Sequence, residues 1–72
     1  MKIIDNRGLE PPQPMMRTLK NLDNMQIGEK LTIMNDRRPM FLYEELDDRG
    51  YVHETEAQED GSYKITITKT GE

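Results

Sequence analysis

The chain has 72 residues, with 14 acidic and 10 basic side chains, a net charge of −4 and no cysteine. This length suits one domain, which buries only about 60% of its unfolded surface. The excess of acidic residues argues against general nucleic-acid binding, because the negatively charged phosphate backbone of a nucleic acid repels a negatively charged protein. The lack of cysteine excludes a disulfide scaffold and favours the cytoplasm. No apolar run approaches the roughly 18 residues of a membrane span, so neither a signal peptide nor a membrane helix is expected.

The first half of the chain reads as strand, helix, strand: residues 2–6, 12–23 and 30–35. The apolar side chains of the helix recur at i, i+4 and i+7: Met15, Leu19 and Leu22. Pro12 suits the first helical position, where a missing N–H costs no intrahelical bond. In the second strand, Leu31 and Ile33 alternate with Thr32, so one side of the strand should be buried.

The second half reads as helix, strand, strand: residues 39–48, 51–58 and 63–68. The inward face of the helix should carry Leu42 and Leu46, with either Phe41 or Tyr43 beside them. Gly50 fits the C-terminal cap of this helix. Residues 59–62 contain the Asp-Gly pair that is typical of a hairpin turn, so the last two strands should be antiparallel neighbours.

This element order, βαβαββ, predicts an α+β fold. A strand–helix–strand unit of this length makes the first two strands parallel, through a right-handed crossover. We expect a two-layer α/β sandwich, with both helices on one face of a four-stranded mixed sheet. One domain should span residues 1–69, and residues 70–72 should form a frayed tail.

Residues 5–14, DNRGLEPPQP, resemble the opening of the TusA/SirA sulfur-carrier family, which reads Asp-x-x-Gly-Leu-x-Cys-Pro-x-Pro before its first helix. Gly8, Leu9, Pro12 and Pro14 match this pattern. The chain is still more similar to a cysteine-less branch, a domain of unknown function whose members read similarly through GLEPPQP, NDRRP and LYEEL…RGY. The resemblance implies a bacterial-type, cytoplasmic domain with the TusA/SirA-like fold.

Pro11 stands where that family has its carrier cysteine. Persulfide transfer requires a reactive thiolate, so this chain has no side chain that could carry sulfur in this way. We therefore predict no enzymatic activity, no catalytic residue and no cofactor. His53, the only histidine, has no convergent ligands in the sequence, because its neighbour Glu54 points to the other face of the strand. No metal site is expected.

Candidate binding residues gather where the first two strands end and the helices begin: Arg7, Gly8, Pro11, Pro12, Gln13, Met15, Arg37 and Arg38. Ligands of open α/β sheets usually bind at this edge, and guanidinium groups can hold a phosphate, a sulfate or a carboxylate. Two alternatives stay open. The arginines could be solvated or paired, Arg7 with Asp5 or Asp36. The prolines could simply start the helix rigidly, removing two N–H donors.

These features predict a small monomeric binding module that takes a protein partner, a small anion or both at this edge. The alternative is an accessory subunit of sulfur or redox metabolism, acting with a partner's cysteine or cofactor. A nucleic-acid-associated regulator is disfavoured by the negative charge and by the lack of aromatic residues on a basic sheet face.

Overall fold

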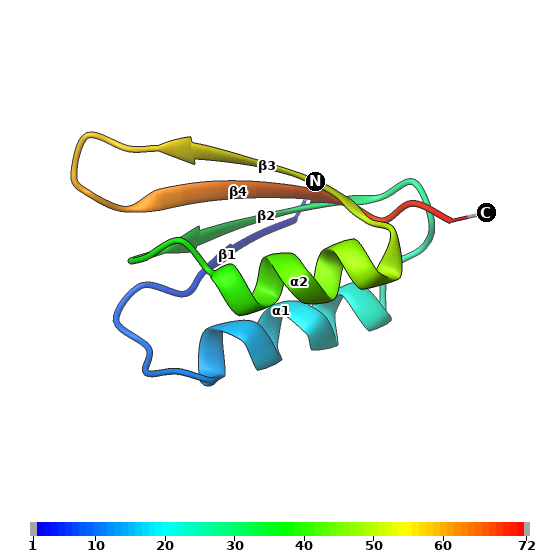
Figure 1. Ribbon diagram of the computed structural model, residues 1–72, viewed down its shortest axis with the longest axis horizontal. Helices are drawn as coiled ribbons and strands as arrows, with labels where there is room; N and C mark the ends of the chain where they lie inside the picture. Colours follow the sequence, from blue (N-terminus) through cyan, green and yellow to red (C-terminus); the bar gives the residue numbers. More distant parts are fainter. Residues whose placement is uncertain (1, 72) are drawn as a thin grey trace.

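The computed structural model describes residues 2–71, which form two helices and four strands. In chain order they are β1 (Lys2–Asp5), α1 (Gln13–Asp23), β2 (Lys30–Asn35), α2 (Met40–Arg49), β3 (Val52–Ala57) and β4 (Tyr63–Thr68). The two helices lie side by side on one face of the sheet (Figure 1). The two-layer sandwich that the sequence predicts is therefore confirmed.

The sheet has the strand order β1-β2-β4-β3. β1 pairs with β2 in parallel, whereas β4 pairs antiparallel with both β2 and β3. The C-terminal ends of β1 and β2 consequently meet at one edge of the sheet. The chain leaves this edge twice, and each time it enters a helix, so the N-termini of α1 and α2 are brought to the same end of the molecule (Figure 1).

The core lies between the helices and the sheet and consists of eight buried aliphatic side chains: Ile4, Leu22, Leu31, Ile33, Leu42, Leu46, Ile65 and Ile67. Of the two aromatic candidates on α2, Tyr43 packs against this core. Its ring stacks on His53, with centroids 4.8 Å apart, and its hydroxyl hydrogen-bonds to the Thr55 hydroxyl. Phe41 is 78% exposed, because it lies on the opposite side of the helix from the sheet.

The predicted boundaries of the helices and strands agree with the structure to within one residue at each end. Pro12 and Pro39 are the cap residues that precede α1 and α2, rather than the first helical residues. Each proline still accepts the first helical hydrogen bond through its carbonyl, from Met16 and Tyr43 respectively. The Thr70 hydroxyl donates to the Gly50 carbonyl, whereas Glu72 lies outside the described residues, so the frayed tail stays a prediction. Over residues 2–71, neither helix is long and apolar enough to cross a membrane.

Candidate functional site

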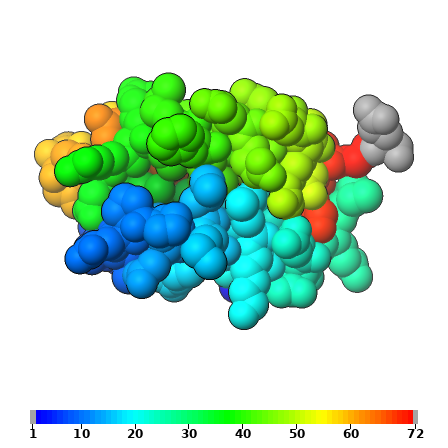
Figure 2. All heavy atoms as spheres, turned by 60° about the horizontal axis from the view of Figure 1, so that its bottom comes forward, coloured from blue at the N-terminus to red at the C-terminus, as the bar shows by residue number. Residues whose placement is uncertain are grey.

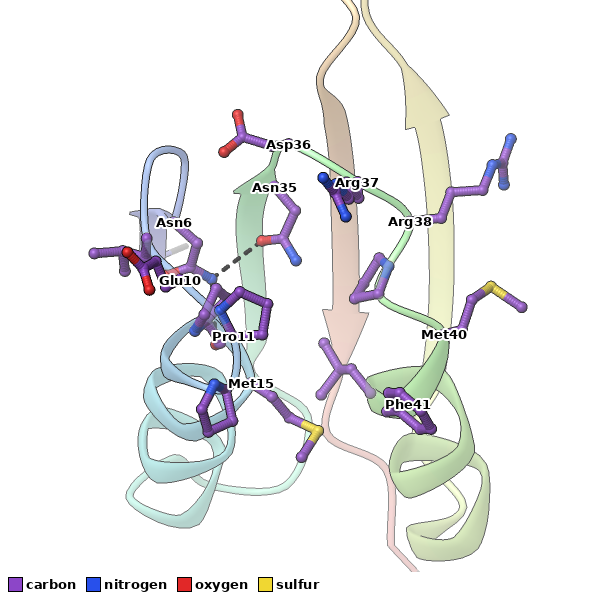
Figure 3. Close-up of a pocket in the computed structure, with 15 residues that line it drawn as sticks. Asn6, Glu10, Pro11, Met15, Asn35, Asp36, Arg37, Arg38, Met40 and Phe41 are labelled. Atoms are coloured by element: carbon purple, nitrogen blue, oxygen red, sulfur yellow. Dashed lines mark hydrogen bonds between the residues drawn. The ribbon is translucent and has the colours of Figure 1, made fainter.

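A pocket of about 650 Å³ opens between the N-termini of α1 and α2, at the edge where β1 and β2 end. Most of its lining is apolar: Leu9, Pro11, Pro12, Pro14, Met15, Pro39, Met40, Phe41 and Leu42. The polar residues that line it are Asn6, Glu10, Asn35, Asp36, Arg37 and Arg38. Figure 3 shows both groups. An apolar pocket of this size with a few convergent polar groups is typical of a ligand-binding site.

Three buried polar side chains form a chain of hydrogen bonds at the sheet end of the pocket. The Thr18 hydroxyl donates to the Pro14 carbonyl over 2.8 Å, so its oxygen is left to act as an acceptor. The Asn6 amide nitrogen donates to that oxygen and to the Asn35 side-chain oxygen, both over 3.2 Å. The second of these bonds is the dashed line in Figure 3. Because the Thr18 hydroxyl hydrogen is used on the Pro14 carbonyl, the Asn6 atom that faces the Thr18 oxygen is the amide nitrogen. The Asn35 atom that faces this nitrogen is therefore its side-chain oxygen.

The orientation of the Asn35 amide follows from this arrangement. Its oxygen faces Asn6, so its nitrogen faces the other way, toward the space between the helices (Figure 3). Asn35 is only 6% exposed, and no residue within the described part of the chain accepts a hydrogen bond from this nitrogen. The pocket therefore contains a hydrogen-bond donor that has no acceptor within residues 2–71. The buried side-chain atom that lacks a partner in this part of the chain is a different one, the Asn6 oxygen, so the Asn35 nitrogen is still within reach of water from the pocket.

Arg7 does not line the pocket, although it follows β1 directly. Its guanidinium pairs with Asp5 over 2.8 Å and with Asp60 of the β3–β4 turn over 3.3 Å. The hydrogen bond from the Arg7 side chain lowers the pKa of Asp5 to about 2, and that with Asp5 raises the pKa of Arg7. Asp36 instead accepts the Gly8 N–H over 2.7 Å. The sequence left Asp5 or Asp36 as the partner of Arg7. In the structure Arg7 pairs with Asp5 and, in addition, with Asp60.

The other two arginines differ in orientation. The Arg38 guanidinium lies 5.0 Å from the centre of the Tyr63 ring, a cation–π contact. Figure 3 shows this side chain turned away from the space between the helices, whereas Arg37 lies closer to it. Arg37 makes no ion pair or hydrogen bond with any residue that the structure describes. Of the three arginines at this end, Arg37 is thus the cation available to a ligand.

The two helix starts offer different numbers of free N–H groups. At α1, Pro12 and Pro14 have none, and the Gln13 N–H donates to the Glu10 carbonyl over 2.9 Å. Met15 alone keeps a free N–H in that first turn, as far as the described residues show.

At α2, the Met40 N–H donates to the Arg38 carbonyl, and no side chain caps the helix. The N–H groups of Phe41 and Leu42 have no acceptor among residues 2–71. Anion recognition at this end is consequently favoured by α2 rather than by α1.

Of the eight residues predicted for the site, Pro11, Pro12, Met15, Arg37 and Arg38 line the pocket, whereas Arg7, Gly8 and Gln13 do not. The sequence-based prediction missed Asn6, Asn35, Met40 and Phe41. One signal was available: Asn6 and Asn35 both stand at the end of a strand that enters the core, where a buried amide must be hydrogen-bonded. Within residues 2–71, no three His, Asp or Glu side chains lie together in a way that could hold a metal ion.

Comparison with protein families shows which family the chain belongs to. A family model described as "Uncharacterized conserved protein (DUF2249)" matches residues 3–69, and the chain belongs to this family. The crystal structure of a SirA-like protein from Desulfitobacterium hafniense is similar to this chain, with a TM-score of 0.86 and 26% sequence identity. The alignment covers 99% of this chain and 100% of that one. The fold is therefore SirA/TusA-like, as the resemblance implied, and the sequence that adopts it contains no cysteine. Comparison with curated proteins finds no match.

Proposed function

We propose that this DUF2249 member is a cytoplasmic, monomeric and non-enzymatic binding module, whose pocket receives an apolar segment of a protein partner. One observation carries the proposal: two large apolar side chains stand exposed at the margin of an apolar pocket. Met40 is 62% exposed and Phe41 is 78% exposed, and both line the pocket. Exposed apolar patches next to a cavity are typical of protein-binding surfaces, and Met and aromatic residues are enriched in them.

The composition of the pocket favours binding over chemistry. Its lining contains no Ser, Thr, Cys, His, Lys or Tyr, the side chains that most often act as nucleophiles or general bases. Its two carboxylates, Glu10 and Asp36, point away from the space between the helices (Figure 3). Pro11 lines the pocket at the position of the carrier cysteine in the resembling family, so a proline surface replaces a thiol there.

Four prolines also make the pocket rigid on both sides: Pro11, Pro12 and Pro14 before and in α1, and Pro39 before α2. Proline has a fixed φ angle, so a surface built from it loses little conformational freedom when a partner binds. The space-filling view shows the chain around the α1 start, in blue, beside the start of α2, in green (Figure 2). A partner segment that enters between them would touch both helices.

The proposal is tested with Phe41→Ser and Met40→Ser, and with Val52→Ser as the matched control. Val52 is 53% exposed and lies on β3, away from the pocket lining. The immobilised chain is used to capture proteins from an extract of its own cells, and these are quantified by mass spectrometry. We expect Phe41→Ser to reduce capture of the specific partner about 30-fold or more, as for a hot-spot residue. Val52→Ser should leave it unchanged.

Two outcomes would contradict the proposal. If both variants capture the same proteins as the unaltered chain, the exposed side chains do not belong to an interface. If the purified chain forms dimers in sedimentation experiments, and Phe41→Ser restores the monomer, a second copy occupies the surface instead of a different protein. Both variants should unfold at the same temperature as the unaltered chain, because the residues they replace lie outside the core.

A further inference from the structure

We propose that the pocket recognises the C-terminal carboxylate of its partner, bound by the Asn35 amide inside the pocket and by Arg37 at its margin. This inference rests on the proposed function, because it takes for granted that a partner segment enters the pocket. It adds which chemical group of that segment enters and which residues recognise it.

The first step is the free donor on Asn35. The Asn35 side chain is almost wholly buried, but its nitrogen is not among the buried atoms without a partner, so water can reach it from the pocket. The amide keeps this nitrogen turned toward the pocket, because its oxygen is held by Asn6, whose own orientation is set by Thr18 and the Pro14 carbonyl. A ligand that places an oxygen next to the Asn35 nitrogen would satisfy the donor. The ligand group at this point is therefore a hydrogen-bond acceptor.

The second step is the sign of its charge. The groups that surround the same space are donors or cations: the Asn35 nitrogen, the free N–H groups of Phe41 and Leu42, and Arg37. The N-terminus of α2, a helix of ten residues, adds a partial positive charge. Glu10 and Asp36 point away, and Asp36 is held by the Gly8 N–H. An anionic oxygen gains more from such surroundings than a neutral carbonyl does.

The third step identifies the anion as a carboxylate. A tightly bound phosphate would use the run of N–H groups that a helix start normally offers. At α1 that run is interrupted, since Pro12 and Pro14 have no N–H and the Gln13 N–H donates to Glu10. Within residues 2–71, the start of α2 keeps free N–H groups next to the pocket, those of Phe41 and Leu42, and the two oxygens of a carboxylate can be held by these groups and by the Asn35 nitrogen. The apolar lining requires in addition that the carboxylate be attached to an apolar body.

The last step identifies the source as a chain end. A small free acid would fill the inner part of the pocket and leave Met40 and Phe41 exposed at its margin. The last residues of a partner chain would cover both side chains while their terminal carboxylate reaches Asn35. The middle of a chain would have to bring its backbone past the prolines on the way in and out, whereas a chain end enters once.

The test uses the full chain labelled with ¹⁵N, in which the side-chain NH₂ of Asn35 gives its own pair of NMR signals. The probes are a library of acetylated hexapeptides with apolar residues at the last two positions, the same library with C-terminal amides, and 4-methylpentanoate. We expect the free-acid peptides to shift the Asn35 NH₂ signals together with the backbone amides of Arg37, Phe41 and Leu42. The amidated peptides should bind at least tenfold more weakly.

Two variants locate the interaction. Asn35→Asp keeps the oxygen that Asn6 needs but replaces the donor with an acceptor, so it should abolish carboxylate binding. Gln26→Glu is its control: it makes the same charge change on an exposed residue beyond the other end of α1. Since a buried Asp could also impair folding, Arg37→Gln is the second variant. It changes an exposed side chain, and it should weaken binding severalfold and reduce its dependence on salt.

The outcomes separate this inference from the proposed function. If acid and amide peptides bind equally well at Phe41 and Leu42, a partner segment does enter the pocket but its carboxylate is not recognised, and the inference is wrong. If 4-methylpentanoate binds and no peptide does, both the chain-end source and the proposed protein docking are wrong. Binding by the free-acid peptides that survives both Asn35→Asp and Arg37→Gln would also overturn the inference.

Discussion

Arg7 and Arg37 both stand just beyond the C-terminal end of a strand, yet only Arg37 lines the pocket. Asp5, two residues before Arg7, and Asp60, 53 positions after it, hold the Arg7 guanidinium outside. The nearby partner can be predicted from the sequence, because residues i and i+2 at a strand end can meet in a turn. The distant one cannot, because it depends on where the β3–β4 turn comes to lie in the folded sheet. A single sequence therefore predicts three arginines near one edge but not which of them is free.

The pairing of Arg7 can be measured through the pKa of Asp5. The Arg7 side chain is the largest cause of the low value, about 2, and the Arg7 backbone N–H is the next. In Arg7→Gln we expect the pKa of Asp5 to rise toward, but not reach, 3.8, because the backbone hydrogen bond remains. The measurement is NMR titration of the Asp5 carboxyl carbon. An unchanged pKa would show that the Arg7 side chain does not bind Asp5 in solution.

The same shift has a consequence for stability. A carboxyl with a lowered pKa in the folded state stabilises the protein above its unfolded pKa, and this contribution is lost as the pH falls through the folded value. For Asp5 the loss should occur between about pH 4 and pH 2. Arg7→Gln should therefore flatten the decline of the unfolding midpoint in that range. Both side chains are exposed, so the difference should be small and should shrink further in high salt.

At the scale of the elements, the starts and ends of the helices follow local signals to different degrees. The end of α2 is set by Gly50, which has a φ of 77°. The Tyr51 N–H donates to Leu46 and the Gly50 N–H to Asp47, the two bonds of a Schellman motif. Glycine after an apolar helical pattern predicts this end from the sequence alone. The helix starts are less predictable. At α1, for example, the acceptor of the Gln13 N–H is the Glu10 carbonyl, and this bond depends on the path of the loop before the helix.

Gly50→Ala tests the importance of this cap. Apart from Gly50 itself and its two chain neighbours, no heavy atom of the described residues lies within 4 Å of the position that the new Cβ would take, so the cost comes from the left-handed backbone and not from a clash. We expect a loss of about 1–2 kcal/mol in the free energy of unfolding, measured in urea. Gly50→Asn should cost less, because Asn adopts this conformation more readily. Asp48→Ala, on the exposed surface of the same helix, should change the free energy by less than about 0.5 kcal/mol.

At the scale of the whole molecule, the fold follows from apolar periodicity, and for this reason the sequence predicts it well. Ile4, Ile33 and Ile65 lie opposite one another on β1, β2 and β4, and all three are buried. Each stands at an inward position of a strand with period two, which a single sequence displays directly. The pocket has no such period. It is assembled from two loops and two helix starts, and its key donor depends on Asn6 and Thr18, twelve residues apart.

Ile33 offers the strongest test of how far the stability of the molecule depends on this small core. A domain of this length has a free energy of unfolding of roughly 4–11 kcal/mol, at about 0.05–0.15 kcal/mol per residue. Ile33 is fully buried in β2, between β1 and β4. Ile33→Val should cost about 0.5–1.5 kcal/mol and Ile33→Ala about 2–5 kcal/mol, because the second change leaves a cavity that the surrounding sheet cannot close.

The matched control is Ile3→Ala, which removes the same side-chain atoms from the neighbouring strand. Ile3 is 68% exposed, so this change should cost less than about 0.5 kcal/mol. Thermal unfolding should show the midpoint falling by about 4–8 °C for each kcal/mol lost. Ile33→Ala should consequently lose a large part of its folded population near 40 °C, while Ile3→Ala stays folded. Equal effects of Ile33→Ala and Ile3→Ala would mean that the face of the sheet turned toward the helices does not dominate stability, because Ile3 and Ile33 differ in burial and not in chemistry.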